Sequence, residues 1–210
     1  FDEQLKQLNK EMINMGTMIE KSIGDAVKAL MKQDVELAQK VMAGDEEIDR
    51  TERKIEDLCL RLLLQQQPVA RDLRNISAAL KMVTDMERIG DHATDISELA
   101  IVLSEKTYVK KLDHIEEMAR ETMVMLIQSL EAYVEKDLDK AQKVIAHDDV
   151  IDDLFEEVKQ ELIELIRNHA DEGEQAVDLL MVTKYFERIG DHATNIAEWV
   201  IFSITGQIAG

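Results

Sequence analysis

Residues 87–94 read ERIGDHAT, and residues 187–194 read the same eight letters. An identical octapeptide of such mixed composition indicates an internal repeat. A second pair of segments agrees with it, because DVELAQKVMAGDEEID at residues 34–49 resembles DLDKAQKVIAHDDVID at residues 137–152. The chain is therefore predicted to hold two copies of one unit, with a small length difference in a turn.

Each copy is predicted to contain three amphipathic helices. In the first copy, apolar residues recur every three or four positions over residues 2–32, which is the helical period. Asp34 is placed to cap a second helix, which runs to the chain's only proline, Pro68. A third helix covers residues 72–103. In the second copy the same elements are expected at residues 110–135, 137–168 and 174–204.

This pattern predicts an all-α fold. No segment shows the strict alternation of a strand, and short connections make amphipathic helices antiparallel neighbours. We therefore expect six long helices as two tandem, quasi-repeated antiparallel three-helix bundles, over residues 1–105 and 106–210. Because aromatic residues make up only 4% of the chain, the core must be built from Leu, Ile, Val, Met and Ala.

The net charge of −19 limits the classes of partner. Direct binding of nucleic acid or anionic lipid needs clustered Lys and Arg, so a chain this acidic is a poor candidate for either. The acidity suits cation binding, basic protein partners, or solubility alone. The single cysteine, Cys59, permits no internal disulfide and fits a reducing compartment. With no secretory pattern and no long apolar run, we expect a cytoplasmic protein.

Acidic residues recur every four positions on two helices of the first copy. Asp45 and Asp49 lie on the second helix, whereas Glu87, Asp91 and Asp95 lie on the third. Residues four apart share one helix face, and like charges at this spacing repel. Because Asp49 and Asp91 are equally far in sequence from the intervening turn, an antiparallel hairpin brings them level. The same reasoning sets Asp45 level with Asp95, so the two rows are predicted to converge.

The second copy repeats these acidic rows with one change. Its acids are Asp148, Asp152, Glu187 and Asp191. Asn195 stands in the place of Asp95, so we expect this copy to bind fewer ions or to bind them more weakly. Clusters of carboxylate oxygens suit hard or borderline divalent cations. The predicted metal ligands are Asp45, Asp49, Glu87, Asp91 and Asp95 in the first copy and Asp148, Asp152, Glu187 and Asp191 in the second.

Several neighbouring residues leave alternatives open. His92 and His192 lie close in sequence, but a lone histidine is more often structural than a ligand. Arg88 and Arg188 could instead pair with the acids, which would make each acidic row an ion-paired flank without metal. Glycine inside a helix costs about 1 kcal/mol relative to alanine, and close helix approach is the expected reason for the repeated glycine of the octapeptide.

These same residues make the chain resemble the PhoU family over nearly its whole length. The resemblance rests on the D-x-x-x-D stretches at Asp45 and Asp148, the repeated E-R-I-G-D-H-A-T segments, the QQPVARDLR stretch at residues 66–74, and the tail from Glu198 to Gly206. It implies six helices in two similar bundles, with E(D)-x-x-x-D motifs that hold multinuclear metal clusters on the surface. The implied ions are divalent or transition metals such as Fe, Zn, Mn or Mg.

The resemblance also implies a role. PhoU-like proteins are negative regulators of phosphate uptake and of phosphate-starvation signalling. They link the ATPase subunit of the phosphate ABC transporter to a sensor histidine kinase, so the chain would reach the membrane only through its partners. A homodimer is expected, and no catalytic activity.

Two other readings remain beside the regulator. A metal-dependent hydrolase could use clustered metal to activate water, and an acidic helical adaptor could dock a basic partner without metal. Di-iron redox chemistry is disfavoured, because none of the five histidines has an acid three residues before it, as Glu-x-x-His sites require. The chain also lacks a P-loop, a nucleophile elbow and an H-E-x-x-H motif.

Overall fold

The computed structural model describes residues 1–65 and 67–208, and this part of the chain is helical with no strand. The elements are α1 (Asp2–Lys32), α2 (Val35–Gln65), α3 (Ala70–Leu103), α4 (Asp113–Glu135), α5 (Leu138–Asn168), the short 3-10 helix η1 (Ala170–Glu172) and α6 (Gly173–Thr205). The predicted all-α fold with six long helices is confirmed. The predicted starts differ by a few residues, since α3 begins at Ala70 and α4 at Asp113.

The turns between the first two helices of each copy have the same construction. Gln33 ends α1 and Lys136 ends α4, both in the left-handed conformation, with φ of 54° and 56°. Asp34 then accepts a hydrogen bond from the amide of Leu37 at 3.1 Å, which confirms the predicted cap. Asp137 accepts one from the amide of Lys140 at 3.0 Å. The sequence repeat is therefore also a repeat of local structure.

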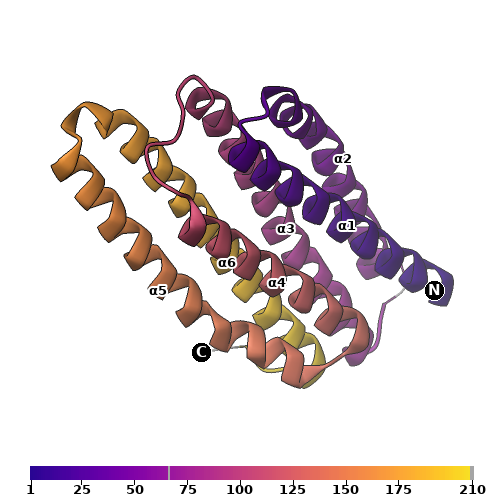
Figure 1. Ribbon diagram of the computed structural model, residues 1–210. Coiled ribbons are helices and arrows are strands. Elements are labelled where there is room, and N and C mark those ends of the chain that lie inside the picture. The colour runs from indigo at the N-terminus through magenta and orange to yellow at the C-terminus, as the bar shows by residue number, and fades with distance from the viewer. Residues whose placement is uncertain (66, 209–210) are drawn as a thin grey trace.

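Each copy forms a three-helix bundle, and the two bundles lie side by side (Figure 1). Helices α1, α2 and α3 contact one another, as do α4, α5 and α6. The bundles meet where α3 packs against α6 and α1 packs against α4, which leaves α2 and α5 on the outside. None of the described helices is long and apolar enough to cross a membrane.

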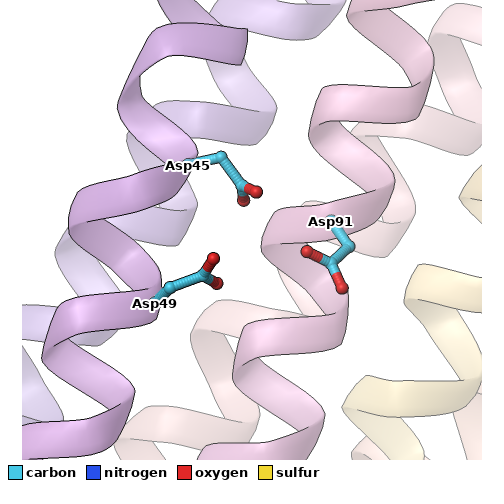
Figure 2. Close-up of side chains that lie close together, drawn as sticks. All are labelled: Asp45, Asp49 and Asp91. Atoms are coloured by element: carbon cyan, nitrogen blue, oxygen red, sulfur yellow. The ribbon is translucent and has the colours of Figure 1, made fainter.

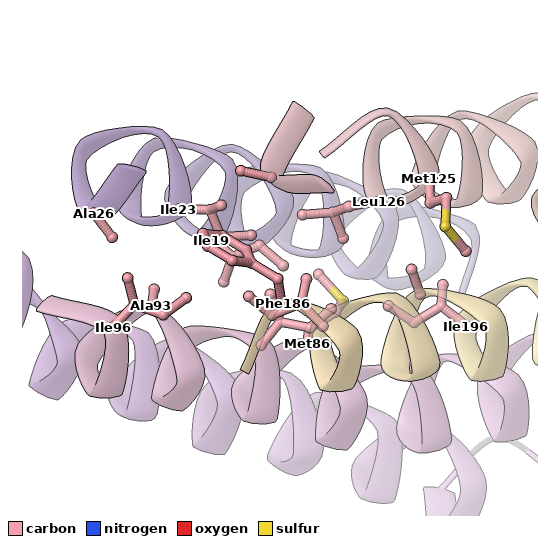
Figure 3. Close-up of a cluster of buried hydrophobic side chains, with 14 of the residues drawn as sticks. Ile19, Ile23, Ala26, Met86, Ala93, Ile96, Met125, Leu126, Phe186 and Ile196 are labelled. Atoms are coloured by element: carbon pink, nitrogen blue, oxygen red, sulfur yellow. The ribbon is translucent and has the colours of Figure 1, made fainter. Parts of the chain in front are cut away.

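One continuous core fills both bundles (Figure 3). Ile19 and Ile23 of α1, Met86 of α3, Leu126 of α4 and Phe186 of α6 are all fully buried in it. As predicted, aliphatic and methionine side chains dominate, with Phe186 and Tyr133 as the largest fully buried residues. Cys59 is buried as well, in agreement with a packing role.

The two octapeptide glycines sit in different surroundings. A Cβ atom on Gly90 would lie 3.3 Å from two side-chain carbons of Ile48, which is tighter than ordinary contact. A Cβ on Gly190 would lie 3.5 Å from the nearest carbon of Ile151, an ordinary van der Waals distance. Close approach of α2 therefore explains the glycine at Gly90, whereas α5 leaves room for a methyl group at Gly190.

Candidate functional site

Carboxylates from two helices converge in the first bundle (Figure 2). Asp45 and Asp49 extend from successive turns of α2, and Asp91 faces them from α3. One oxygen atom from each of the three side chains lies within 4.8 Å of the others. The antiparallel α2–α3 hairpin thus brings Asp49 and Asp91 together, as the predicted register requires.

A second group of three carboxylates adjoins the first and shares Asp49 with it. Its other members are Glu52 of α2 and Glu87 of α3, with one oxygen atom from each residue again within 4.8 Å of the others. Glu52 is not among the metal ligands predicted from the sequence. It lies three residues after Asp49 and seven after Asp45, so helical periodicity alone places it on the same face of α2.

Partial burial and the neighbouring negative charges raise the pKa of three of these acids, Asp45, Glu52 and Glu87. Burial, followed by the charges of Asp49, Asp91 and Asp95, raises the pKa of Asp45 to about 6. Burial and Glu56 raise the pKa of Glu52 to about 7. The pKa of Glu87 rises to about 8, through burial and then through Asp91. A divalent cation would reverse this effect, because it favours the charged form of each carboxylate.

Two oxygen atoms of this cluster lack the partners that buried oxygens normally have. Oδ1 of Asp45 and Oδ1 of Asp49 are both buried and accept no hydrogen bond from the described residues. Carboxylate oxygens of this kind are the ligands that divalent cations take. The first-bundle cluster, defined as Asp45, Asp49, Glu52, Glu87 and Asp91, therefore fits the metal ions that the sequence predicted.

Asp95 and the histidines make a different set of contacts. Oδ2 of Asp95 lies 3.3 Å from Nδ1 of His92, and its charge still reaches Asp45. The His92 ring stacks on those of Tyr185 and His192, at centroid distances of 5.5 and 5.6 Å. Nδ1 of His192 lies 2.9 Å from Oδ1 of Asp85. Both histidines therefore join α3 to α6, and neither belongs to a group of three carboxylate or imidazole ligands in the described chain.

The alternative of an ion-paired flank has little support in the first bundle. Within residues 1–65 and 67–208, neither Arg88 nor Arg188 forms an ion pair with an acid, and the guanidinium of Arg188 lies 5.9 Å from the ring centre of Tyr185. No lysine or arginine of that part pairs with Asp45, Asp49, Glu52, Glu87 or Asp91. Protonation of Glu87 and Glu52, or a bound cation, would offset their repulsion.

The second bundle brings its acids together less closely. Asp148 is half-buried, its Oδ1 has no described partner, and burial with Asp152 and Asp191 raises its pKa to about 6. Yet no three of the predicted ligands Asp148, Asp152, Glu187 and Asp191 satisfy the 4.8 Å criterion in the described chain. The second metal site therefore remains a prediction.

Two substitutions accompany this difference between the bundles. Phe155 stands where α2 has Glu52, and Lys184 stands where α3 has Thr84. The ammonium of Lys184 pairs with Glu187 and lies 5.3 Å from the ring centre of Phe155. The second bundle thus neutralises one of its acids internally, where the first bundle leaves all five uncompensated.

The raised pKa values predict how metal-free protein responds to pH. Folding lifts the pKa of Glu87 from 4.5 to about 8, so between these values the folded state binds more protons than the unfolded state. Stability must then fall as the pH rises through this window. We expect the melting temperature of chelator-treated protein to fall from pH 5 to pH 8, and Glu87→Gln to flatten that slope. Calorimetry at both pH values checks this, and an unchanged slope in the variant would contradict it.

Comparison with known proteins agrees with this architecture. The family model for the PhoU domain matches the chain twice, over residues 12–100 and residues 115–200. The chain belongs to the PhoU family. The two PhoU matches correspond to the two three-helix bundles, and the resemblance noted from the motifs is confirmed.

Individual PhoU proteins match over almost the full chain. The "Phosphate-specific transport system accessory protein PhoU homolog" of Clostridium acetobutylicum is 40% identical, covering 99% of this chain and 95% of that protein. The homolog of the same name from Caulobacter vibrioides is 37% identical over 99% of this chain and 90% of that protein. The crystal structure of PhoU from Pseudomonas aeruginosa superposes with a TM-score of 0.95 at 33% identity, covering 99% of this chain and all of that one.

Proposed function

We propose that this PhoU-family chain is a negative regulator of phosphate uptake and of phosphate-starvation signalling. It would act without catalysis, by linking the ATPase subunit of the phosphate ABC transporter to a sensor histidine kinase. The observation that carries the proposal is the full-length likeness to accessory proteins of the phosphate-specific transport system. It would lie in the cytoplasm as a homodimer and reach the membrane only through these two partners.

The first-bundle cluster would hold divalent or transition metal ions, such as Fe, Zn, Mn or Mg, in a multinuclear arrangement. Asp49 belongs to both groups of three carboxylates, so it would help to hold an ion at either one. Bound cations would neutralise five clustered acids and fix the relative position of α2 and α3. The face formed by these helices would then present a defined surface to a partner.

Reporter repression tests the regulatory role. A host that lacks its own PhoU and expresses alkaline phosphatase constitutively is grown in phosphate-rich medium, with and without this chain. We expect expression of the chain to lower phosphatase activity. Soluble protein that leaves the activity unchanged, in the native organism's deletion strain as well, would reject the proposal.

The same cluster leaves a metal-dependent hydrolase as a second candidate, since clustered ions can activate water. Steady turnover of a phosphate ester by metal-loaded protein, lost in an Asp49→Ala, Asp91→Ala double variant, would favour it over the regulator. The third candidate, an acidic adaptor without metal, predicts no metal uptake at all.

A further inference from the structure

A cavity of about 710 Å³ lies where the ends of three helices meet, away from the first-bundle cluster. The N-terminal turns of α3 supply Arg71, Arg74 and Asn75, the α4–α5 turn supplies Lys136, and the last turns of α6 supply Ser203. A cavity of this volume falls within the range of pockets that enclose small-molecule ligands.

The side chains that line this cavity are mainly basic, although the molecule as a whole is acidic. Arg71, Arg74 and Lys136 line it together with a single acid, Asp72, although the chain as a whole carries a net charge of −19. Within residues 1–65 and 67–208, none of the three cations lies within ion-pair distance of a carboxylate. Like charges gathered without counter-ions repel one another, so their convergence calls for an anion.

The Arg74 side chain has an unused donor. Its Nε is buried and donates to no described acceptor, a situation that is rare for buried polar atoms. The side chain passes close to Gly206, which ends α6 with φ of 75° and where an added Cβ would lie 3.4 Å from Cδ of Arg74. Val69 precedes α3 and also lines the cavity, and its side chain offers no cap to the first amides of that helix.

The internal repeat creates an equivalent place in the molecule that lacks these cations. Glu174 stands where α3 has Arg74, and Gln33 stands where the α4–α5 turn has Lys136. The Gln33 amide donates to the carbonyl oxygens of Leu103 and Lys106 at 2.8 and 2.7 Å. The corresponding cavity beside Glu174 is only about 70 Å³. The basic cavity therefore forms at one of the two places that the repeat makes equivalent, between residues of both bundles, and the shared fold does not require it.

We propose that the cavity lined by Arg71, Arg74 and Lys136 binds a small anion that carries a phosphate group. Guanidinium groups pair with phosphate oxygens through two parallel hydrogen bonds, and a helix N-terminus adds backbone donors. The ligand is either inorganic phosphate or a phosphorylated small molecule such as a nucleotide, whose remaining atoms the larger volume would accommodate. The proposal does not depend on metal binding or on the regulatory role.

Lys136 gives the site a pH signature. It stays accessible at the cavity, while surrounding protein atoms and then the charge of Arg71 lower its pKa to about 8. Above that pH the ammonium loses its charge, whereas phosphate remains a dianion. Affinity should therefore fall as the pH rises from 7.5 to 9.5. Lys136→Gln should remove this dependence, and Gln33 shows that glutamine occupies the same left-handed turn position in the other copy.

Titration calorimetry of the full chain tests the proposal, after chelation and desalting so that no metal can bind the ligand. Inorganic phosphate, AMP and ATP are the probes, and Asp91→Asn is run in parallel to separate this site from the first-bundle cluster. We expect saturable binding that Arg71→Ala and Arg74→Gln each weaken at least about ten-fold, as loss of a charge-assisted contact does. Arg120→Ala, which removes an exposed arginine elsewhere, should leave the affinity unchanged.

The outcomes distinguish inorganic phosphate from a phosphorylated small molecule, and some of them would reject the site. Tighter binding of AMP or ATP than of inorganic phosphate identifies a phosphorylated small molecule, and equal binding identifies the free ion. No heat from any probe at millimolar concentration overturns the proposal. Binding that survives the Arg71→Ala, Arg74→Gln double variant, with circular dichroism showing intact helices, overturns it as well.

Discussion

Asp91→Asn is expected to remove most of the transition metal that the protein takes up. Asp91 is the α3 member of the group that includes Asp45 and Asp49, and α3 supplies only one other residue to the cluster, Glu87. The substitution keeps the shape of the side chain while it deletes one negative charge. The measurement is metal content by mass spectrometry, after incubation with Fe, Zn or Mn and desalting.

Asp191→Asn is the matched control for this prediction, because Asp191 occupies the same position in the second copy of the octapeptide. Its bundle already carries Lys184 beside Glu187 and Phe155 in place of Glu52. We therefore expect Asp191→Asn to lower the metal content much less than Asp91→Asn. Equal losses would mean that both bundles bind metal alike, and no uptake by the unmodified protein would reject metal binding altogether.

Phe186→Ala should lower the free energy of unfolding by about 3–5 kcal/mol, the usual cost of emptying a large buried aromatic site. Phe186 is fully buried on α6 beside residues of α1, α3 and α4, so no single helix can move to fill the space (Figure 3). For a chain of this size the melting temperature should fall by about 10 °C. Chemical denaturation followed by circular dichroism gives the free energy directly.

Leu64→Ala serves as the control for the core prediction. Leu64 is 81% exposed at the end of α2, and exposed substitutions of this kind change stability by about 0.5 kcal/mol or less. If Phe186→Ala cost no more than Leu64→Ala, the central packing described here would be wrong.

The sequence predicts the helices and their pairing because those depend on local and periodic signals. The cap at Asp34, the apolar stripes and the repeated octapeptide can each be read without knowing the tertiary structure. The meeting of Asp49 with Asp91 also follows, since a hairpin of two straight helices has only one register for a given turn. The division at residues 105 and 106 stays a prediction.

Features that depend on side chains from different helices are harder to predict. The helical spacing of Glu52 from Asp45 and Asp49 would have been enough to place it on the same face of α2. The contacts of Lys184 with Glu187 and Phe155, in contrast, depend on how α5 and α6 pack together. The basic cavity draws Arg71, Arg74 and Lys136 from the start of one helix and the end of another. Their distance in sequence gives no indication that they converge, and only the packing of the two bundles brings them together.

The single core has a consequence for how the protein loses its structure. Helix α3 packs on α6 and α1 on α4 within one apolar cluster. If one bundle unfolded, the buried apolar face of the other would therefore become exposed to water. Melting should then occur as one cooperative event whose calorimetric and van't Hoff enthalpies agree. Under that coupling, an ion bound between α2 and α3 would raise the energy needed to open α5 on the far side of the molecule.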